Sequence, residues 1–184
     1  MASHTVVWET PRADNMVQYV RAHLDKWAST PHPVAVFDID ETLLINSPED
    51  AVTEGIVDNK PGHVLYNSVR KHKIPVYIVT ARKKSEASHD YAVRQLHSLG
   101  YTAFERLYLT PTKYCRDDDP SRFKADARAR IEAQHGGKIV LCVGDQITDH
   151  LAPGQSLDHP VRRDLYCGFV SPSTPECLSV KLPE

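Results

Sequence analysis

Long apolar runs are missing from this sequence of 184 residues, and none approaches the roughly 20 residues that span a bilayer. The start of the chain also lacks the basic segment and apolar core of a secretory signal peptide, so we expect a cytoplasmic protein without membrane contacts. Basic and acidic side chains nearly balance, 22 against 24. The composition therefore gives no broad positive surface of the kind that binds nucleic acid.

Cysteine is scarce, with four residues and no C-x-x-C pair. The ten histidines are scattered and form no H-E-x-x-H motif, which argues against zinc. Cys142 lies inside an apolar run, where we expect a buried small hydrophobe. A Cys167–Cys177 disulfide stays open as an alternative, but we expect free thiols in a chain without an export signal.

The remaining composition is that of an ordinary globular protein, with 41% hydrophobic and 25% charged residues. The length corresponds to about one domain. We therefore expect a single domain over residues 1–184. The motifs described below lie within about residues 33–151.

Short β-branched runs alternate with stretches of helical length. Continuous hydrophobicity in these runs is typical of parallel strands that are buried on both faces. The predicted strands are residues 34–37, 74–79, 107–109, 139–143 and 165–170. The predicted helices run from about 16 to 27, 61 to 72, 84 to 99 and 120 to 135. This alternation predicts an α/β fold, with a central parallel sheet flanked by helices.

Polar residues follow three of the predicted strands. Asp38 and Asp40 follow the first, Thr80 the second, and Asp145 and Asp149 the fourth. In an open parallel sheet, the ligand site lies beyond the carboxyl ends of the strands, so these residues are expected to converge. Crowded carboxylates repel one another unless a cation neutralises them. Oxygen ligands without histidine or cysteine favour Mg²⁺.

A carboxylate beside Mg²⁺ has a clear use in phosphate chemistry. It can attack phosphorus and form an aspartyl-phosphate, while the metal offsets the repulsion between the two anions. A second carboxylate at the same strand end can serve the leaving-group oxygen as a general acid.

These segments resemble the four motifs of the haloacid dehalogenase-like (HAD) superfamily. Residues 38–42 are similar to its D-x-D-E-T motif, residues 79–82 to its second motif, and residues 144–149 to its G-D-x-x-x-D motif. Lys124, with Arg128 four residues later, resembles the K-x-x-x-R of the acid-phosphatase branch. The order of the motifs matches that of the superfamily, and the resemblance implies a Rossmannoid HAD-like fold.

The resemblance also implies a role for each matching residue. Asp38 would be the nucleophile and a metal ligand. Asp40 would be the general acid and base, and its backbone carbonyl would also bind the metal. Asp145 would complete the protein ligands of Mg²⁺. Asp149 would either orient the site without touching the metal or reach the metal through a water molecule.

The phosphoryl group would be held by Thr80, Ala81 and Lys124, as the resemblance implies. Lys113 is the alternative to Lys124, because a lone lysine is a weak pattern. Arg82, Lys83 and Lys84 allow two interpretations, a rim that attracts phosphate or a solvated basic loop.

The second aspartate of the first motif favours a phosphatase over a dehalogenase. The intervals from Asp38 to Thr80 and from Thr80 to Lys124 each hold little more than one helix and one strand, so we expect no large cap domain. An open site of this kind suits a nucleotide or another small phosphomonoester. It also admits a polynucleotide end or a phosphoprotein, or closure by a second subunit in a homo-oligomer.

A third alternative is a regulatory module that binds Mg²⁺ or phosphate without turnover. The presence of Asp38, Asp40 and Asp145 together argues against it, because the fold alone does not require these carboxylates. Residues 47–59 form a candidate flap over the site.

Overall fold

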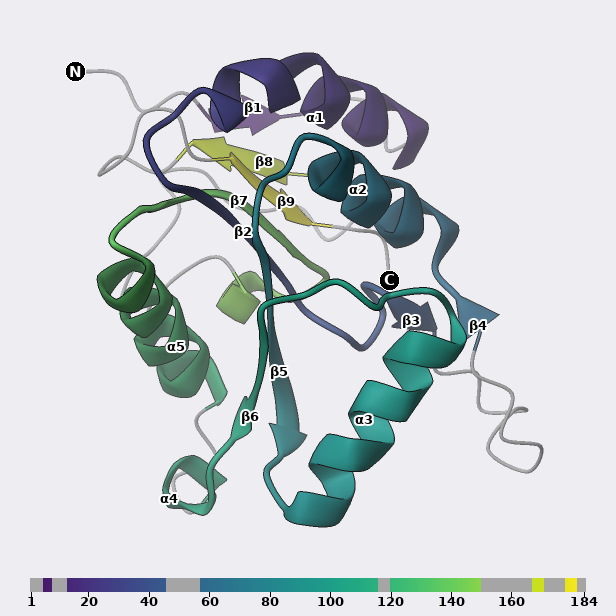
Figure 1. Cartoon of the computed structure of the whole chain (residues 1–184), viewed down its shortest axis with the longest axis vertical. Coiled ribbons are helices and arrows are strands. Elements are labelled where there is room, and N and C mark those ends of the chain that lie inside the picture. The colour runs from purple at the N-terminus through teal and green to yellow at the C-terminus, as the bar shows by residue number, and fades with distance from the viewer. Residues whose placement is uncertain are drawn as a thin grey trace.

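A seven-stranded mixed sheet forms the centre of the protein (Figure 1). The computed structural model describes residues 5–7, 13–45, 57–115, 120–149, 167–170 and 178–181. In spatial order the strands are β1 (Thr5–Val7), β8 (Cys167–Val170), β9 (Leu178–Lys181), β7 (Lys138–Gly144), β2 (Pro33–Phe37), β5 (Val76–Lys83) and β6 (Arg106–Thr110).

The centre of this sheet is parallel, as the sequence predicts. β2 pairs in parallel with β5 on one side and with β7 on the other, and β5 pairs in parallel with β6. β9 extends the parallel part beyond β7, while β8 and β1 add antiparallel pairs at that edge. The chain therefore has the predicted α/β fold, a central parallel sheet flanked by helices.

Strand β2 is buried on both faces, which explains why its sequence is apolar at every position. Ala35 and Phe37 belong to one hydrophobic core, whereas Val34 and Val36 belong to a second core on the other face. Because successive side chains point to opposite faces, a strand covered on both sides needs apolar residues at every position.

The helices divide between the two faces (Figure 1). α1 (Ala13–Ala28), α2 (Lys60–Lys71) and α3 (Glu86–Ser98) contribute to the larger core. α5 (Pro120–His135) packs on the other face through Phe123, Ala127 and Ile131, whose spacing of four residues places them on one side of the helix. A short α4 (Thr112–Cys115), which the sequence pattern does not predict, precedes α5.

Helix ends agree with the local chemistry of the sequence. Ser85 caps α3 through a reciprocal pair of hydrogen bonds with Ser88, so the helix begins two residues later than expected. Gly136, just beyond α5, has a φ of 67°, a conformation that glycine adopts readily. Asp119, directly before α5, is a residue type that often caps helices, but it lies outside the described residues.

A second, two-stranded sheet follows the end of β2. β3 (Leu44–Ile45) and β4 (Val57–Asp58) pair in antiparallel fashion, and residues 46–56 between them lie outside the described residues. β4 therefore falls within the candidate flap. No helix in the described ranges combines the length and apolarity needed to cross a membrane.

One cysteine side chain is placed by the structure. Cys142 on β7 is a buried thiol within the second hydrophobic core, as its apolar surroundings predict. The side chains of the other three cysteines are not among those described, and Cys177 lies outside the described residues altogether, so the predicted absence of a disulfide stays a prediction.

Candidate active site

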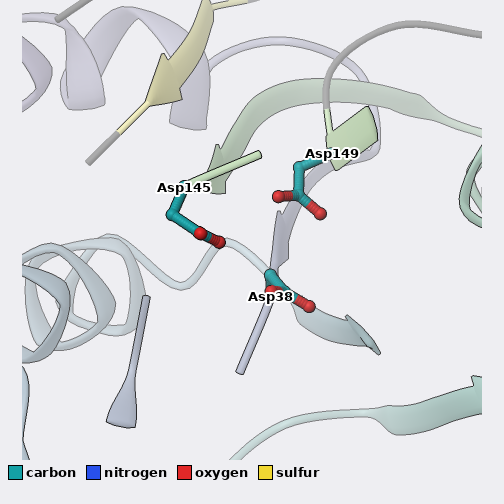
Figure 2. A group of neighbouring side chains, drawn as sticks. All are labelled: Asp38, Asp145 and Asp149. Atoms are coloured by element: carbon teal, nitrogen blue, oxygen red, sulfur yellow. The ribbon is translucent and has the colours of Figure 1, made fainter. Parts of the chain in front are cut away.

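Three buried aspartates meet at the carboxyl end of the parallel sheet (Figure 2). Asp38 follows β2, Asp145 follows β7, and Asp149 ends a short 3₁₀ helix, η2 (Ile147–Asp149). A carboxylate oxygen of each lies within 4.8 Å of one from each of the others. Strand register explains the convergence, because Phe37 pairs with Val143 and the Asp38 amide donates to the Val143 carbonyl at 2.9 Å.

Asp149 reaches this cluster because the chain turns sharply after β7. Its Oδ2 accepts a hydrogen bond of 3.0 Å from the backbone amide of Gln146. The carboxylate occupies the space where a Cβ on Gly144 would lie, so a side chain at position 144 would overlap it. The glycine of the G-D-x-x-x-D pattern is thus required by the packing of its last aspartate.

Lys124, on α5, is the cation of this cluster. Its ammonium group donates to Oδ1 of Asp149 and lies 3.3 Å from Oδ1 of Asp38. Arg128, one turn later on α5, donates to the backbone carbonyls of Thr148 and Asp149 at 3.0 and 2.8 Å. α5 therefore holds the backbone of η2 through Arg128 and contacts the Asp149 carboxylate through Lys124. The alternative candidate, Lys113, is exposed on α4 and lies over the Tyr114 ring instead.

Burial dominates the electrostatics of the cluster. It raises the pKa of Asp38 well above the ordinary aspartate value, and the nearby charge of Asp149 raises it further. Burial also raises the pKa of Asp145 and of Asp149, although Lys124 partly offsets the effect at Asp149. Burial acts against the charge of Lys124, but the carboxylates of Asp38 and Asp149 outweigh it and raise the pKa of the lysine.

The donor set fits a hard divalent cation. Asp38 Oδ1 is buried and accepts no hydrogen bond, although the Lys124 ammonium group lies 3.3 Å from it, so this oxygen has room for a further partner. Asp38, Asp145 and Asp149 offer only oxygen atoms, the ligands that Mg²⁺ prefers. An ion held by these oxygens would satisfy Asp38 Oδ1 and neutralise the repulsion in the cluster.

Thr80 ends the buried part of β5, beside the end of β2. Phe37 pairs with Ile78, so Asp38 and Thr80 leave neighbouring strands at the same edge. The Thr80 hydroxyl accepts a hydrogen bond of 3.2 Å from the Arg82 amide, and the Thr80 carbonyl accepts one from the Thr110 hydroxyl. Ala81, the other predicted phosphate-binding residue of this segment, is exposed.

The side chain of Asp40 contacts a different partner from the other aspartates. Its carboxylate forms a two-pronged ion pair with Arg82, in which Nη2 donates to Oδ1 at 2.6 Å and Nε donates to Oδ2 at 2.9 Å. Gln95, buried on α3, accepts from the remaining terminal nitrogen of Arg82 at 2.6 Å. Sequence patterns do not predict this contact for Gln95; the only signal is the arginine directly after Thr80 and Ala81.

The turn after Asp40 is held from beneath by the start of α2. Glu41 has a φ of 54°, and its carbonyl accepts a hydrogen bond of 3.1 Å from the Asn59 side chain. Gly62 on α2 lies so close to this turn that a Cβ there would overlap the Thr42 carbonyl oxygen. The Tyr101 hydroxyl also contacts the Leu43 carbonyl, at 3.0 Å. The turn that carries Asp40 is therefore fixed by several elements at once.

Comparison with known proteins identifies the family. Residues 49–163, more than half of the chain, match the HAD superfamily, subfamily IIIB (acid phosphatase). The chain belongs to this family. The match includes Thr80, Lys124, Asp145 and Asp149 and begins after Asp38 and Asp40. No curated protein shows significant similarity to the chain.

Membership of this acid-phosphatase subfamily makes the protein a phosphatase, and the family acts on phosphomonoesters. The HAD resemblance seen in the sequence is confirmed. Within the described residues, the segment between Asp38 and Thr80 forms β3, β4, α2 and the start of β5, with no separate cap domain.

Proposed function

We propose that the protein is a Mg²⁺-dependent phosphomonoesterase that works through a phosphorylated Asp38. The observation that carries the proposal is the environment of the Asp38 carboxylate. One of its oxygens is buried without a hydrogen bond, beside two further carboxylates and the Lys124 ammonium group. A carboxylate held in this way suits both metal binding and attack on phosphorus.

The charges of the site support a two-step reaction. Asp38 would attack phosphorus while the bond from phosphorus to the leaving oxygen breaks, and Asp40 would give its proton to that oxygen. Water would then attack the phosphorylated Asp38, releasing phosphate, and Asp40 would take up the proton of the water. Atoms and protons balance over the two steps, and Asp40 returns to its starting form.

Lys124 and Thr80 would hold the phosphoryl oxygens, with Ala81 contributing from the exposed end of β5. Asp38 and Asp145 would hold Mg²⁺ through their carboxylates and Asp40 through its backbone carbonyl, with Asp149 keeping Asp145 and Lys124 in place. The metal would supply positive charge that lowers the repulsion between Asp38 and the anionic phosphate.

We propose a nucleotide or another small phosphomonoester as the substrate. The two-stranded β3–β4 sheet and α2 leave no separate domain among the described residues to enclose a ligand. Substrate recognition would then come from the rim of the site and from residues on this sheet, or from a second copy of the chain in a homo-oligomer.

Phosphate release tests this proposal directly. The assay uses a panel of nucleotides, sugar phosphates, phosphorylated oligonucleotides and phosphopeptides, each with Mg²⁺ and with EDTA. Wild type is expected to release phosphate only with Mg²⁺, and Asp38→Asn is expected to lose activity by at least about 10³-fold. The exposed Asp90→Asn on α3 is the matched control and keeps wild-type activity.

Other outcomes separate the alternatives. Preference for oligonucleotide ends with a steep salt dependence would replace the small substrate with a polynucleotide. Preference for the phosphopeptides would indicate a phosphoprotein phosphatase. A folded wild type that binds Mg²⁺ but releases no phosphate from any substrate would contradict the proposal and favour a regulatory module.

A further inference from the structure

Arg82 connects the two sides of the candidate site. Its side chain holds the Asp40 carboxylate, which follows β2, and its backbone amide donates to the Thr80 hydroxyl on β5. The guanidinium is largely buried, with 19% of the side chain exposed, and the Asp40 side chain is 33% exposed. A single residue therefore contacts both the predicted proton donor and a predicted phosphate ligand.

Gln95 holds the end of the Arg82 guanidinium group that does not contact Asp40. Its side chain lies on the buried face of α3, and its Oε1 accepts a hydrogen bond of 2.6 Å from Arg82 Nη1. The contacts of Arg82 thus use three different nitrogen atoms: Nε and Nη2 for Asp40, and Nη1 for Gln95. Because the guanidinium is planar, fixing its far edge on Gln95 also fixes the edge that faces Asp40.

We infer that Arg82, braced by Gln95, is a positioning residue for the proton transfer of Asp40. This inference rests on the proposed function, because it assigns Arg82 a role within that reaction. Arg82 acts on the chemistry through the Asp40 carboxylate and makes no contact of its own with the reacting atoms.

The physical reason is the charge that appears on Asp40 during the first step. As the phosphorus–oxygen bond breaks, the proton moves from Asp40 to the leaving oxygen, and the carboxyl group becomes a carboxylate. The two-pronged contact with Arg82 is the arrangement that stabilises a carboxylate most strongly. It is already in place, so little reorganisation is needed when the charge develops.

This role has a consequence that a purely structural role lacks. A poor leaving group, such as an alkoxide, needs the proton from Asp40, whereas a good one, such as 2,4-dinitrophenolate, departs without it. Loss of Arg82 is therefore expected to slow the hydrolysis of alkyl phosphates strongly and that of dinitrophenyl phosphate only weakly. An arginine that bound the substrate phosphate directly would slow both substrates alike, because the phosphate is common to both.

The test measures kcat/KM with glycerol phosphate and with 2,4-dinitrophenyl phosphate, in Mg²⁺. The variants are Arg82→Met, Asp40→Asn and the double variant, with exposed Arg94→Met on α3 as the matched control. Arg82→Met is expected to lose about 10–100-fold with glycerol phosphate and less than about threefold with the dinitrophenyl ester. In the Asp40→Asn background, the same change is expected to cost less than about threefold with either substrate.

Gln95→Leu gives a second, milder probe if Arg82→Met folds poorly. It leaves Asp40 and Arg82 in the chain and is expected to lose about 3–10-fold with glycerol phosphate alone. Gln95→Glu, which keeps an acceptor for Nη1, is expected to retain most of the wild-type ratio between the two substrates. Inhibition by inorganic phosphate is expected to be the same in Arg82→Met and wild type.

Three results would overturn the inference. Equal losses with both substrates, together with weaker inhibition by phosphate, would make Arg82 a phosphate ligand. A full loss that persists in the Asp40→Asn background would show that Arg82 does not act through Asp40. No loss with either substrate would make the ion pair structural only. A wild type inactive on both substrates and on the whole panel would instead contradict the proposed function.

Discussion

The ammonium nitrogen of Lys124 lies 3.3 Å from Oδ1 of Asp38, and the two side chains are only 3% and 6% exposed. With Asp145 and Asp149 ionised as well, three carboxylates face one ammonium group, which leaves two negative charges. Asp40 is not counted in this balance, because its side chain contacts Arg82 and not Lys124. The cluster therefore matches the charge of one divalent cation.

Mg²⁺ is expected to stabilise the protein against heat. A ligand that binds only the folded state at 100 times its Kd adds about 2.7 kcal/mol to the free energy of unfolding. Asp145→Asn removes one carboxylate of the cluster and is expected to lose most of this gain, whereas exposed Asp90→Asn keeps it. Thermal melts with Mg²⁺ and with EDTA measure the effect, and equal melting temperatures for wild type under both conditions would contradict it.

The metal-free protein is expected to lose stability as pH rises from about 4. Burial raises the pKa of Asp145, so the folded state holds a proton that the unfolded chain has already released. The unfolded state then binds fewer protons, and the free energy of unfolding falls with rising pH.

The measurement for this prediction compares wild type with Asp145→Asn in EDTA. Urea unfolding at several pH values gives both curves, and histidine contributions cancel in their difference. The free energy of unfolding is expected to fall more steeply with rising pH in wild type than in the variant. Mg²⁺ is expected to reduce this difference. Parallel curves would show that Asp145 carries no raised pKa.

Lys124→Met is expected to destabilise the metal-free protein by about 3–5 kcal/mol, because it leaves buried carboxylates without their cation. The matched control is Lys113→Met on α4, an exposed lysine whose loss is expected to change stability by about 0.5 kcal/mol or less. Urea unfolding in EDTA measures both. Equal small effects would place Lys124 outside the charge balance of the site.

Gly62→Ala is expected to destabilise the protein, although alanine in a helix normally stabilises by about 1 kcal/mol relative to glycine. The added Cβ would overlap the Thr42 carbonyl and displace the turn that carries Asp40. We expect a loss of about 2–4 kcal/mol together with lower phosphatase activity. Gly136→Ala is the comparison, because an added Cβ there would meet nothing within 4 Å, while its φ of 67° is unfavourable for alanine. We expect the free energy of unfolding to fall by about 1 kcal/mol and the activity to stay unchanged. A more stable Gly62→Ala would contradict the close contact.

The sequence predicts the centre of the fold well, because each central strand carries its own signal. Residues 34–37 and 139–143 are apolar at every position, and both form parallel strands within β2 and β7. Local patterns do not predict β1 or β9, although β9 lies inside the sheet, between β8 and β7. β1 has three residues and β9 has four, and β9 takes its place only by pairing with β7, which no local pattern specifies.

In the site, too, features with a local sequence signal could be predicted, and features that depend on packing could not. Asp38 and Asp145 could be predicted to converge because each comes directly after a strand, and the HAD resemblance added Lys124. The contact between Arg82 and Gln95 could not be predicted, since it depends on the distance between the end of β5 and the buried face of α3. The overlap between Gly62 and Thr42 likewise depends on how α2 packs under the turn.

The position of β2 between two neighbours from distant parts of the chain has a consequence for synthesis. Ala35 pairs with Val76 on one side, but its partner on the other side, Leu141, leaves the ribosome much later. Until then Asp38 has neither Asp145 nor Asp149 beside it, and contacts between residues far apart in sequence form slowly. If the proposed roles of these residues hold, a nascent chain that ends before β7 is therefore expected to have no phosphatase activity, and the first activity would indicate that β7 has paired with β2.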